Sequence, residues 1–194
     1  MVELQDILSR LEKVFSAVKI RYVIVGGIAV IHYGHVRTTQ DIDILIEDDP
    51  SKFSQFLDLL RTNEFDVMDN QFHLGYQEKT NISIFNKRGY IRLDLKVADK
   101  KKEKEVLDNA VLEKILDYRL YIAPLEYVLL GKIIFLGRID DLPDSELFEY
   151  QDIIDFLTLY HANKEKINLE FLKKKTKEIN LDSTLDKLLS LKLL

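Results

Sequence analysis

The sequence predicts an α+β fold, in which a mixed β-sheet with flanking helices is followed by a C-terminal helical part. Two observations support this prediction. Runs with strand spacing alternate with runs with helical spacing in the first part of the chain, whereas helical spacing dominates afterwards. The 194 residues are also enough for one sizeable core. We therefore expect an α/β domain over residues 1–120 and a helical region over residues 121–194 that packs on it.

The first elements are a helix, a buried strand and a short helix. Apolar residues recur at helical spacing over residues 3–18, which predicts an amphipathic helix with one buried face. "RYVIVGG" (residues 21–27) is typical of a buried strand that ends in a turn. "GIAVIHYG" (residues 27–34) then predicts a short helix that ends at Gly34.

Further strands and one helix follow. "DIDILIE" (residues 41–47) predicts a second strand, and residues 50–63 predict a helix that starts at Pro50 and Ser51. Three more runs have strand character, which makes the expected sheet mixed; they are "FHLGYQ" (72–77), "NISIFN" (81–86) and "YIRLDLKV" (90–97).

The rest of the chain is expected to be charged and then helical. "DKKKEKE" (residues 99–105) is typical of a solvated charge run. After this run the chain is expected to be almost wholly helical, starting from "PLEYVLLGKIIFLGR" (124–138) and continuing through "DSELFEYQDIIDFLTLYHAN" (144–163) to the end. No internal repeat or low-complexity linker interrupts it.

Composition excludes several classes of protein. A hydrophobic content of 46% with 31% charged residues indicates a folded chain rather than a disordered one. The net charge of −5 argues against a protein that coats nucleic acid non-specifically. The absence of cysteine excludes disulfides and thiolate metal sites. Because neither a signal peptide pattern nor an apolar run of membrane-spanning length is found, we expect a cytoplasmic protein with no membrane partner.

Acidic residues inside predicted strands are the main functional signal. Side chains alternate between the two faces of a strand, so Asp41 and Asp43 project together while Ile42 and Ile44 point to the core. Two carboxylates held this close repel each other unless the pKa of one rises or a cation binds. Magnesium prefers such oxygen ligands together with substrate phosphates. Asp94, the acid within "YIRLDLKV", is a third candidate ligand. The alternative for the Asp41 and Asp43 pair is a sheet edge that faces water.

The double glycine supplies the second part of the predicted site. Gly26 and Gly27 end a strand and open a short helix, where backbone N–H groups can approach a phosphate because no side chain intervenes. The chain lacks the G-x-G-x-x-G pattern of dinucleotide-binding proteins, and no G-K-[ST] follows the glycines as in a P-loop.

Together these residues resemble the nucleotidyltransferase superfamily, which includes DNA polymerase beta and the aminoglycoside nucleotidyltransferases. "GHVRTTQDIDI" is most similar to the prokaryotic minimal and abortive-infection toxin-type members, in which G-x-x-R-x-T-x-D-I-D recurs. The positions that fill this pattern are Gly34, Arg37, Thr39, Asp41 and Asp43. The resemblance covers residues 22–47 and Asp94, and it is thinner over the helical half. Gln151 departs from it, because a basic residue more often precedes the next aspartate in relatives.

The resemblance implies a nucleotidyltransferase-like fold and a reaction. A nucleoside monophosphate would be transferred from a nucleoside triphosphate to an acceptor hydroxyl on a transfer RNA end, a protein or a small molecule, with release of pyrophosphate. The implied partners include an antitoxin, if the chain is a toxin–antitoxin component. Asp41 and Asp43 would ligate two magnesium ions, and Asp94 would ligate one and take the proton. The implied nucleotide contacts are Gly26, Gly27, Arg37, Thr39 and Lys132.

Several alternatives remain open from the sequence. The chain is also consistent with a non-catalytic nucleotide-binding or partner-binding module that retains the fold. Arg37 has an alternative role as a structural bridge to the first aspartate, and Thr39 as a partner of backbone groups in the turn. Lys132 fits equally a lysine that snorkels from an apolar helix. Asp152 and Asp155 are expected at the solvent or paired with lysines rather than on a metal.

Overall fold

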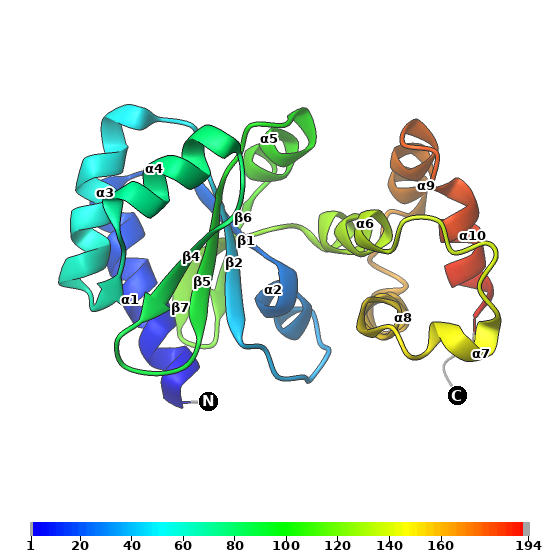
Figure 1. Ribbon diagram of the computed structural model, residues 1–194. Helices are drawn as coiled ribbons and strands as arrows, with labels where there is room; N and C mark the ends of the chain where they lie inside the picture. The colour runs from blue at the N-terminus through cyan, green and yellow to red at the C-terminus, as the bar shows by residue number, and fades with distance from the viewer. Residues whose placement is uncertain (1, 192–194) are drawn as a thin grey trace. The chain divides into compact units, whose positions relative to one another are not determined.

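Seven strands form one mixed sheet in the order β3-β4-β5-β2-β1-β7-β6 in the computed structural model, which describes residues 2–191 (Figure 1). The strands are β1 (Tyr22–Val25), β2 (Asp41–Ile46), β3 (Phe65–Asp66), β4 (Ile82–Asn86), β5 (Arg92–Val97), β6 (Val111–Ile115) and β7 (Tyr118–Ile122). β2 runs parallel to β5 and β1 runs parallel to β7, whereas the other neighbours are antiparallel. The predicted α+β fold with a mixed sheet is therefore confirmed.

Ten helices accompany the sheet within the described part of the chain. They are α1 (Val2–Val18), α2 (Gly26–His32), α3 (Pro50–Thr62), α4 (Asp69–Glu78), α5 (Lys101–Asp108), α6 (Leu125–Leu136), α7 (Asp144–Leu147), α8 (Gln151–Asn163), α9 (Leu169–Glu178) and α10 (Asp182–Ser190). α1, α3 and α4 pack on one face of the sheet (Figure 1). This arrangement buries the face of β2 that carries Ile42, Ile44 and Ile46, and it leaves the alternate face of β2 for Asp41 and Asp43.

Internal contacts divide the structure into two compact units. Unit 1 contains residues 2–28 and Thr38–Pro124, and therefore the whole sheet. Unit 2 contains Ala29–Arg37 and residues 125–191, and therefore the helices from α6 onwards. The predicted boundary at residue 120 lies just before Pro124, but the sequence contains no signal that groups Ala29–Arg37 with the later helices.

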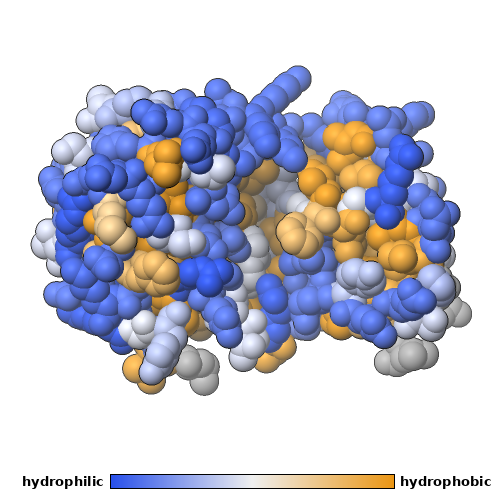
Figure 2. Space-filling view, in the orientation of Figure 1, coloured by the Kyte–Doolittle hydropathy of each residue, from blue (hydrophilic) through white to orange (hydrophobic). Residues whose placement is uncertain are grey.

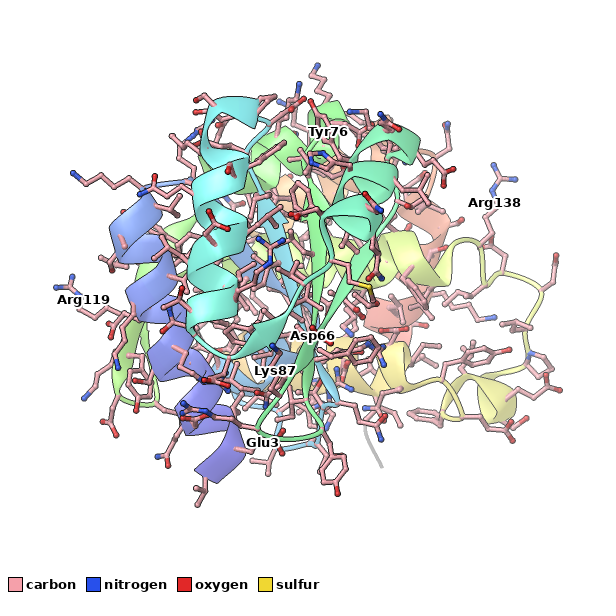
Figure 3. The ribbon with its side chains drawn as sticks, turned by 60° about the vertical axis from the view of Figure 1, so that its left-hand side comes forward. Glu3, Asp66, Tyr76, Lys87, Arg119 and Arg138 are labelled. Atoms are coloured by element: carbon pink, nitrogen blue, oxygen red, sulfur yellow. The ribbon has the colours of Figure 1, made fainter. Side chains whose placement is uncertain are left out.

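The first helix is tied to the turn between β4 and β5. Glu3 lies at the start of α1 beside this turn (Figure 3), and its Oε1 accepts a hydrogen bond of 2.8 Å from the Ile91 backbone N–H. Gly89 in the turn makes the approach possible, because a Cβ there would lie 2.0 Å from the same oxygen. The contact joins residues 88 positions apart and stabilises the pairing of β4 with β5, the strand that carries Asp94.

One predicted strand is wrong. "FHLGYQ" lies inside α4 rather than in a strand. A strand would place Phe72 and Leu74 on the same face, but Phe72 is buried and Leu74 is 53% exposed. Phe72 and Gly75 instead share one helical face, and Gly75 fits tightly, since a Cβ there would lie 2.4 Å from the Ile82 side chain.

Residues 111–122 form the β6–β7 hairpin, which was not predicted, and the helical region expected from residue 121 begins after it with α6. β7 has a clear period of two, with Leu120 and Ile122 buried and Arg119 exposed. The turn lacks glycine, and Leu116 adopts a positive φ of 56° in its place. Because Gly or Asn is the usual signal for such a turn, the hairpin could not be recognised from the sequence.

The charge run "DKKKEKE" is another correction, because most of it forms the start of α5. Glu103 in this run is buried rather than solvated. Its carboxylate accepts hydrogen bonds from Lys96 Nζ at 2.6 Å and from the backbone N–H of Lys100 at 3.0 Å. The burial could not be read from the run itself, since Lys96 comes from β5.

The face seen in Figure 2 is mainly hydrophilic, and hydrophobic side chains are exposed on it in several places. The most exposed large ones are Val2, Val36, Tyr90 and Phe135. Among residues 2–191, no helix is long and apolar enough to cross a membrane.

Candidate active site

The three predicted aspartates lie on one face of two adjacent strands. β2 carries Asp41 and Asp43 at alternate positions, and β5 carries Asp94. Asp43 and Asp94 are direct partners in the parallel register. The side chains keep different contact with solvent, with exposed fractions of 31% for Asp41 and 13% for Asp94. The alternation that predicted a shared face for Asp41 and Asp43 is thus seen in the structure, and the parallel pairing of β2 with β5 brings Asp94 to the same face.

Arg92 is a further residue of this face, and it was not predicted from the sequence. It is the register partner of Asp41 on the neighbouring strand. Its guanidinium Nη2 lies 3.1 Å from Asp41 Oδ2, and its Nε lies 3.1 Å from Asp94 Oδ1 and 3.2 Å from Asp94 Oδ2. The signal was present, because Arg92 and Asp94 are two residues apart in a strand and therefore share a face.

We call the sheet face that carries Asp41, Asp43 and Asp94 the acidic face, and its negative charge raises the pKa of Arg92. The hydrogen bond to Asp94 raises this pKa most, and the negative charges of Asp94, Asp41 and Asp43 raise it further against a smaller opposing effect of burial. All three carboxylates therefore act on one guanidinium.

Two hydroxyl groups orient the carboxylates. Ser83 on β4 is the register partner of Asp94, and its Oγ donates a hydrogen bond of 2.6 Å to Asp94 Oδ1. Thr39 Oγ1 lies 3.1 Å from both the backbone oxygen and the Oδ1 of Asp41. Thr39, a predicted nucleotide contact, thus hydrogen-bonds a backbone group at the start of β2, which is the structural role given above as the alternative.

Gly26 lies directly against Asp43. Val25, which precedes it, pairs with Asp43 across β1 and β2. Gly26 has a positive φ of 62°, and a Cβ at this position would lie 1.9 Å from Asp43 Oδ2. Only glycine fits both the backbone conformation and the space. Gly27 follows in the first turn of α2 and is buried.

The donor chemistry of this face fits a hard divalent cation such as magnesium. Three carboxylates from adjacent strands offer oxygen ligands, which magnesium prefers. Asp41, Asp43 and Asp94 are the residues that would hold it. In the part of the chain that the structure describes, however, no three acidic or histidine side chains are grouped closely enough to hold a metal ion as they stand.

Arg37 and Lys132 lie in unit 2, around a different aspartate. Asp155 on α8 is fully buried. The groups that surround its carboxylate are Lys132 Nζ at 2.6 Å, His35 Nδ1 at 2.8 Å, Gln151 Nε2 at 3.0 Å and Arg37 Nε at 3.4 Å. We call this set the Asp155 cluster.

The Asp155 cluster holds its aspartate in the ionised form. Burial by itself would raise the pKa of Asp155, but hydrogen bonds from Lys132 and Gln151 and the charges of Lys132 and Arg37 together lower it. Lys132 Nζ also lies 2.7 Å from Asp152 Oδ1. The expected pairing of Asp152 and Asp155 with a lysine is therefore seen. The nucleotide contacts predicted for Arg37 and Lys132 stay a prediction, since both side chains are engaged within unit 2.

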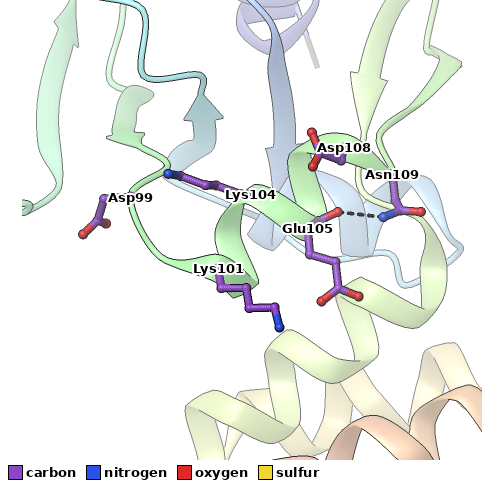
Figure 4. Close-up of a pocket in the computed structure, with 6 residues that line it drawn as sticks. All are labelled: Asp99, Lys101, Lys104, Glu105, Asp108 and Asn109. Carbon is purple, nitrogen blue, oxygen red and sulfur yellow. Dashed lines mark hydrogen bonds between the residues drawn. The ribbon is translucent and has the colours of Figure 1, made fainter.

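A hollow of about 550 Å³ lies beside α5 (Figure 4). Its lining residues are Asp99, Lys101, Lys104, Glu105, Asp108 and Asn109. None of the predicted site residues lines it, and its charges are mixed. The acidic face of β2 and β5 therefore remains the candidate active site.

Residues 2–86 match the family described as "Nucleotidyltransferase of unknown function (DUF6036)". This segment contains Gly26, Gly27, Asp41 and Asp43 and ends before Asp94. No curated protein was found to match the sequence.

Several solved structures share the fold at low sequence identity. The solution structure of the antibiotic-resistance factor ANT(2'')-Ia has a TM-score of 0.59 and 14% identity, and the similarity covers 96% of this chain and 97% of that one. ANT(2'')-Ia in complex with adenylyl-2''-tobramycin gives the same TM-score and identity over 93% and 99%. An antigenic nucleotidyltransferase-like protein from Paracoccidioides brasiliensis has a TM-score of 0.53 and 19% identity over 93% and 91%.

The two kinds of comparison agree. Likeness at such identities shows the fold alone, and the fold is similar over more than nine tenths of the chain. The family match supplies a sequence relationship over the segment that carries the double glycine and the first two aspartates. The resemblance to the nucleotidyltransferase superfamily is confirmed by the family match over residues 2–86, and the fold of the chain is nucleotidyltransferase-like.

Proposed function

We propose that the chain is a magnesium-dependent nucleotidyltransferase, which transfers a nucleoside monophosphate from a nucleoside triphosphate to an acceptor hydroxyl. One observation carries the proposal. Asp41, Asp43 and Asp94 share one sheet face, with Asp43 and Asp94 in register and the backbone of Gly26 against Asp43. Carboxylates beside a close backbone approach are suited to binding metal ions and phosphates together.

In the proposed reaction the three aspartates and the backbone of Gly26 and Gly27 have different roles. The acceptor oxygen forms a bond to the α-phosphorus, the bond from that phosphorus to the bridging oxygen breaks, and pyrophosphate leaves. Bound magnesium would supply charge neutralisation at the phosphates. Asp94 receives the proton of the acceptor hydroxyl, and Ser83, which donates to Asp94 Oδ1, keeps that carboxylate oriented. Gly26 and Gly27 leave room for the triphosphate near Asp43.

The test is transfer of label from α-labelled nucleoside triphosphates in the presence of magnesium. Each triphosphate is incubated with total RNA, with cell-lysate protein, with aminoglycosides or without an acceptor, and both label and pyrophosphate are measured. Asp43→Asn should reduce transfer by at least about 100-fold, since it removes a charged ligand next to the phosphates. Asp117→Asn is the matched control, because Asp117 is 72% exposed in the β6–β7 turn. Unchanged turnover in Asp43→Asn would contradict the proposal.

The acceptor class follows from this test. The fold neighbour ANT(2'')-Ia has been solved with adenylyl-2''-tobramycin, so a small-molecule hydroxyl is one class to include. A transfer RNA end and a partner protein are the other classes. An antitoxin partner is part of the proposal only if the labelled acceptor, or inhibition of transfer, is traced to a companion protein.

A second candidate is a non-catalytic nucleotide-binding or partner-binding module. It is favoured by the ion pairs of Arg92, which engage oxygens of Asp41 and Asp94 that a metal ion needs. Calorimetry with a nucleoside triphosphate separates the two candidates. Magnesium-dependent binding without pyrophosphate in any fraction would support the module, and pyrophosphate release lost in Asp43→Asn would support the enzyme.

A further inference from the structure

We propose that Arg92 is a resident counter-ion of the acidic face, a positioning residue that holds Asp41 and Asp94 in place and gives up their oxygens when a divalent metal ion enters. This inference rests on the proposed function in one respect, because it requires that the metal binds at these carboxylates. It assigns a role to a residue outside the glycine and aspartate pattern.

Geometry is the first support. Arg92 bridges two strands, since it belongs to β5 and its guanidinium reaches Asp41 on β2 at 3.1 Å. Its Nε contacts both oxygens of Asp94, at 3.1 and 3.2 Å. A planar guanidinium is well suited to such a fork-like contact. The oxygens that it engages belong to two of the three acids that would bind the metal.

Charge is the second support. Three carboxylates on one sheet face repel each other when no cation is present. The positive charge of Arg92 lies against two of these acids, since its Nη2 is 3.1 Å from Asp41 Oδ2 and its Nε is 3.1 Å from Asp94 Oδ1. Arg92 therefore lowers the electrostatic cost of assembling the acids before a metal ion arrives.

The neighbouring lysine on the same strand face is engaged elsewhere. Lys96 is two residues beyond Asp94, so it projects from the same side of β5. Its Nζ lies 2.6 Å from Glu103 of α5, which holds it in a separate ion pair. Arg92 and Lys96 thus share a face of β5 but contact different carboxylates, and Arg92 is the one that contacts Asp41 and Asp94.

A divalent cation and the guanidinium compete for the same oxygens. Entry of the metal has to break the contacts of Arg92 with Asp41 and Asp94, and each charged hydrogen bond lost weakens metal binding. Since the side chain is 39% exposed, the released guanidinium has solvent to move into. Removing it should therefore strengthen metal binding, although it removes a group that stabilises the face without metal.

The test measures binding of Mn²⁺ without nucleotide, by the electron paramagnetic resonance signal of the free ion. Arg92→Gln should bind Mn²⁺ about tenfold more tightly than the wild type, which corresponds to the loss of one competing charged contact. Arg21→Gln is the matched control, because Arg21 also bridges two carboxylates of unit 1, at 2.9 Å from Glu47 and 2.8 Å from Asp108. It should bind Mn²⁺ as the wild type does.

If the gain in Mn²⁺ affinity of Arg92→Gln arises at the acidic face, it must disappear when Asp43→Asn is combined with Arg92→Gln. Equal affinity of Arg92→Gln and wild type, equal gains in Arg92→Gln and Arg21→Gln, or no Mn²⁺ binding to any of them would overturn the inference. If Arg92→Gln does not fold, the wild type provides the answer. In ¹H–¹⁵N spectra the Arg92 Nε–H signal should shift and exchange faster with water as Mg²⁺ is added, and an unchanged signal would overturn the inference as well.

The two proposals can fail separately. Tighter Mn²⁺ binding in Arg92→Gln, with no nucleotide transfer by the wild type, would leave the counter-ion role standing and refute the enzyme. Nucleotide transfer by the wild type, with no change of Mn²⁺ affinity in Arg92→Gln, would do the reverse.

Discussion

Replacing Lys132 by methionine tests whether this lysine stabilises unit 2 or contacts the nucleotide. Methionine keeps an unbranched apolar stem but removes the charge. Lys132 Nζ lies 2.6 Å from Asp155 Oδ2, and Asp155 is fully buried. Loss of one partner of a buried ion pair costs about 3–5 kcal/mol, because the other charge stays buried.

Other members of the Asp155 cluster reduce this cost. His35, Gln151 and Arg37 still contact the carboxylate in the variant. We therefore expect the free energy of unfolding to fall by about 2–4 kcal/mol. For a chain of this size, the midpoint of thermal unfolding should fall by about 5–15 °C.

The loss should depend on pH. In the wild type the pKa of Asp155 is lowered, so its ionised form contributes stability above the ordinary carboxyl pKa, and this contribution is lost as the pH falls through the lowered value. In Lys132→Met, burial should raise the pKa of the same carboxyl, which protonation then relieves at acid pH. The difference between the two proteins should be largest near pH 7 and shrink towards about pH 4.

Urea unfolding followed by far-ultraviolet circular dichroism at both pH values measures the effect. Lys173→Met is the control, since Lys173 is half exposed on α9 and its Nζ lies 3.4 Å from Glu170. It should change stability by no more than about 0.5 kcal/mol. A Lys132→Met variant as stable as the wild type, or a loss that is equal at both pH values, would refute the reasoning. Intact stability with lost nucleotide binding would favour the contact predicted from the sequence.

Two further predictions concern the sheet. Gly26→Ala should lose more stability and more transfer activity than Gly137→Ala. Both variants place an L side chain at positive φ, which costs about 1–2 kcal/mol. The new Cβ at Gly26 would also lie 1.9 Å from Asp43 Oδ2, whereas a Cβ at Gly137 would meet nothing within 4 Å. Equal losses, measured by thermal unfolding and label transfer, would argue against a tight Gly26–Asp43 contact. Tyr22 should titrate at about 12, because burial raises its pKa; folding stability should therefore fall by up to about 2.7 kcal/mol as the pH rises from about 10 to 12. Tyr22→Phe should lack this part of the fall, and absorbance of tyrosinate against pH measures the titration.

The acidic face was predictable from the sequence because a strand has a strict period of two. Asp43 and Asp94 each stand between apolar residues, and Asp41 lies two residues before Asp43. Alternation alone therefore places Asp41 and Asp43 on one face and marks Asp94 as the acidic candidate of its own strand. The same rule places Arg92 beside Asp94. Arg92 was not predicted as part of the face because its pairing with Asp41 depends on β2 and β5 being parallel neighbours, and strand order cannot be derived from local residue spacing.

Apart from the pairing of Asp155 with a lysine, the Asp155 cluster could not be predicted, for a related reason. Its members come from residues 35–37, α6 and α8, so the contacts span up to 120 positions of the chain. A buried aspartate in an amphipathic helix looks the same in sequence as a surface one, because only its partners distinguish them. The same holds for Glu103, whose lysine partner comes from another element.

The split composition of unit 2 limits how the helical part can be exchanged between related proteins. A chimera made by a single crossover after Pro124 would combine Lys132 and Asp155 of one parent with residues 35 and 37 of the other parent. Those two residues evolved beside a different helical part. Such a chimera would bury a carboxylate beside the wrong neighbours, at the cost of an unsatisfied internal charge. We therefore expect stable recombinant proteins to carry Ala29–Arg37 and the C-terminal helices from the same parent. We also expect substitutions at His35 or Arg37 to reduce the number of residue types that are accepted at position 155.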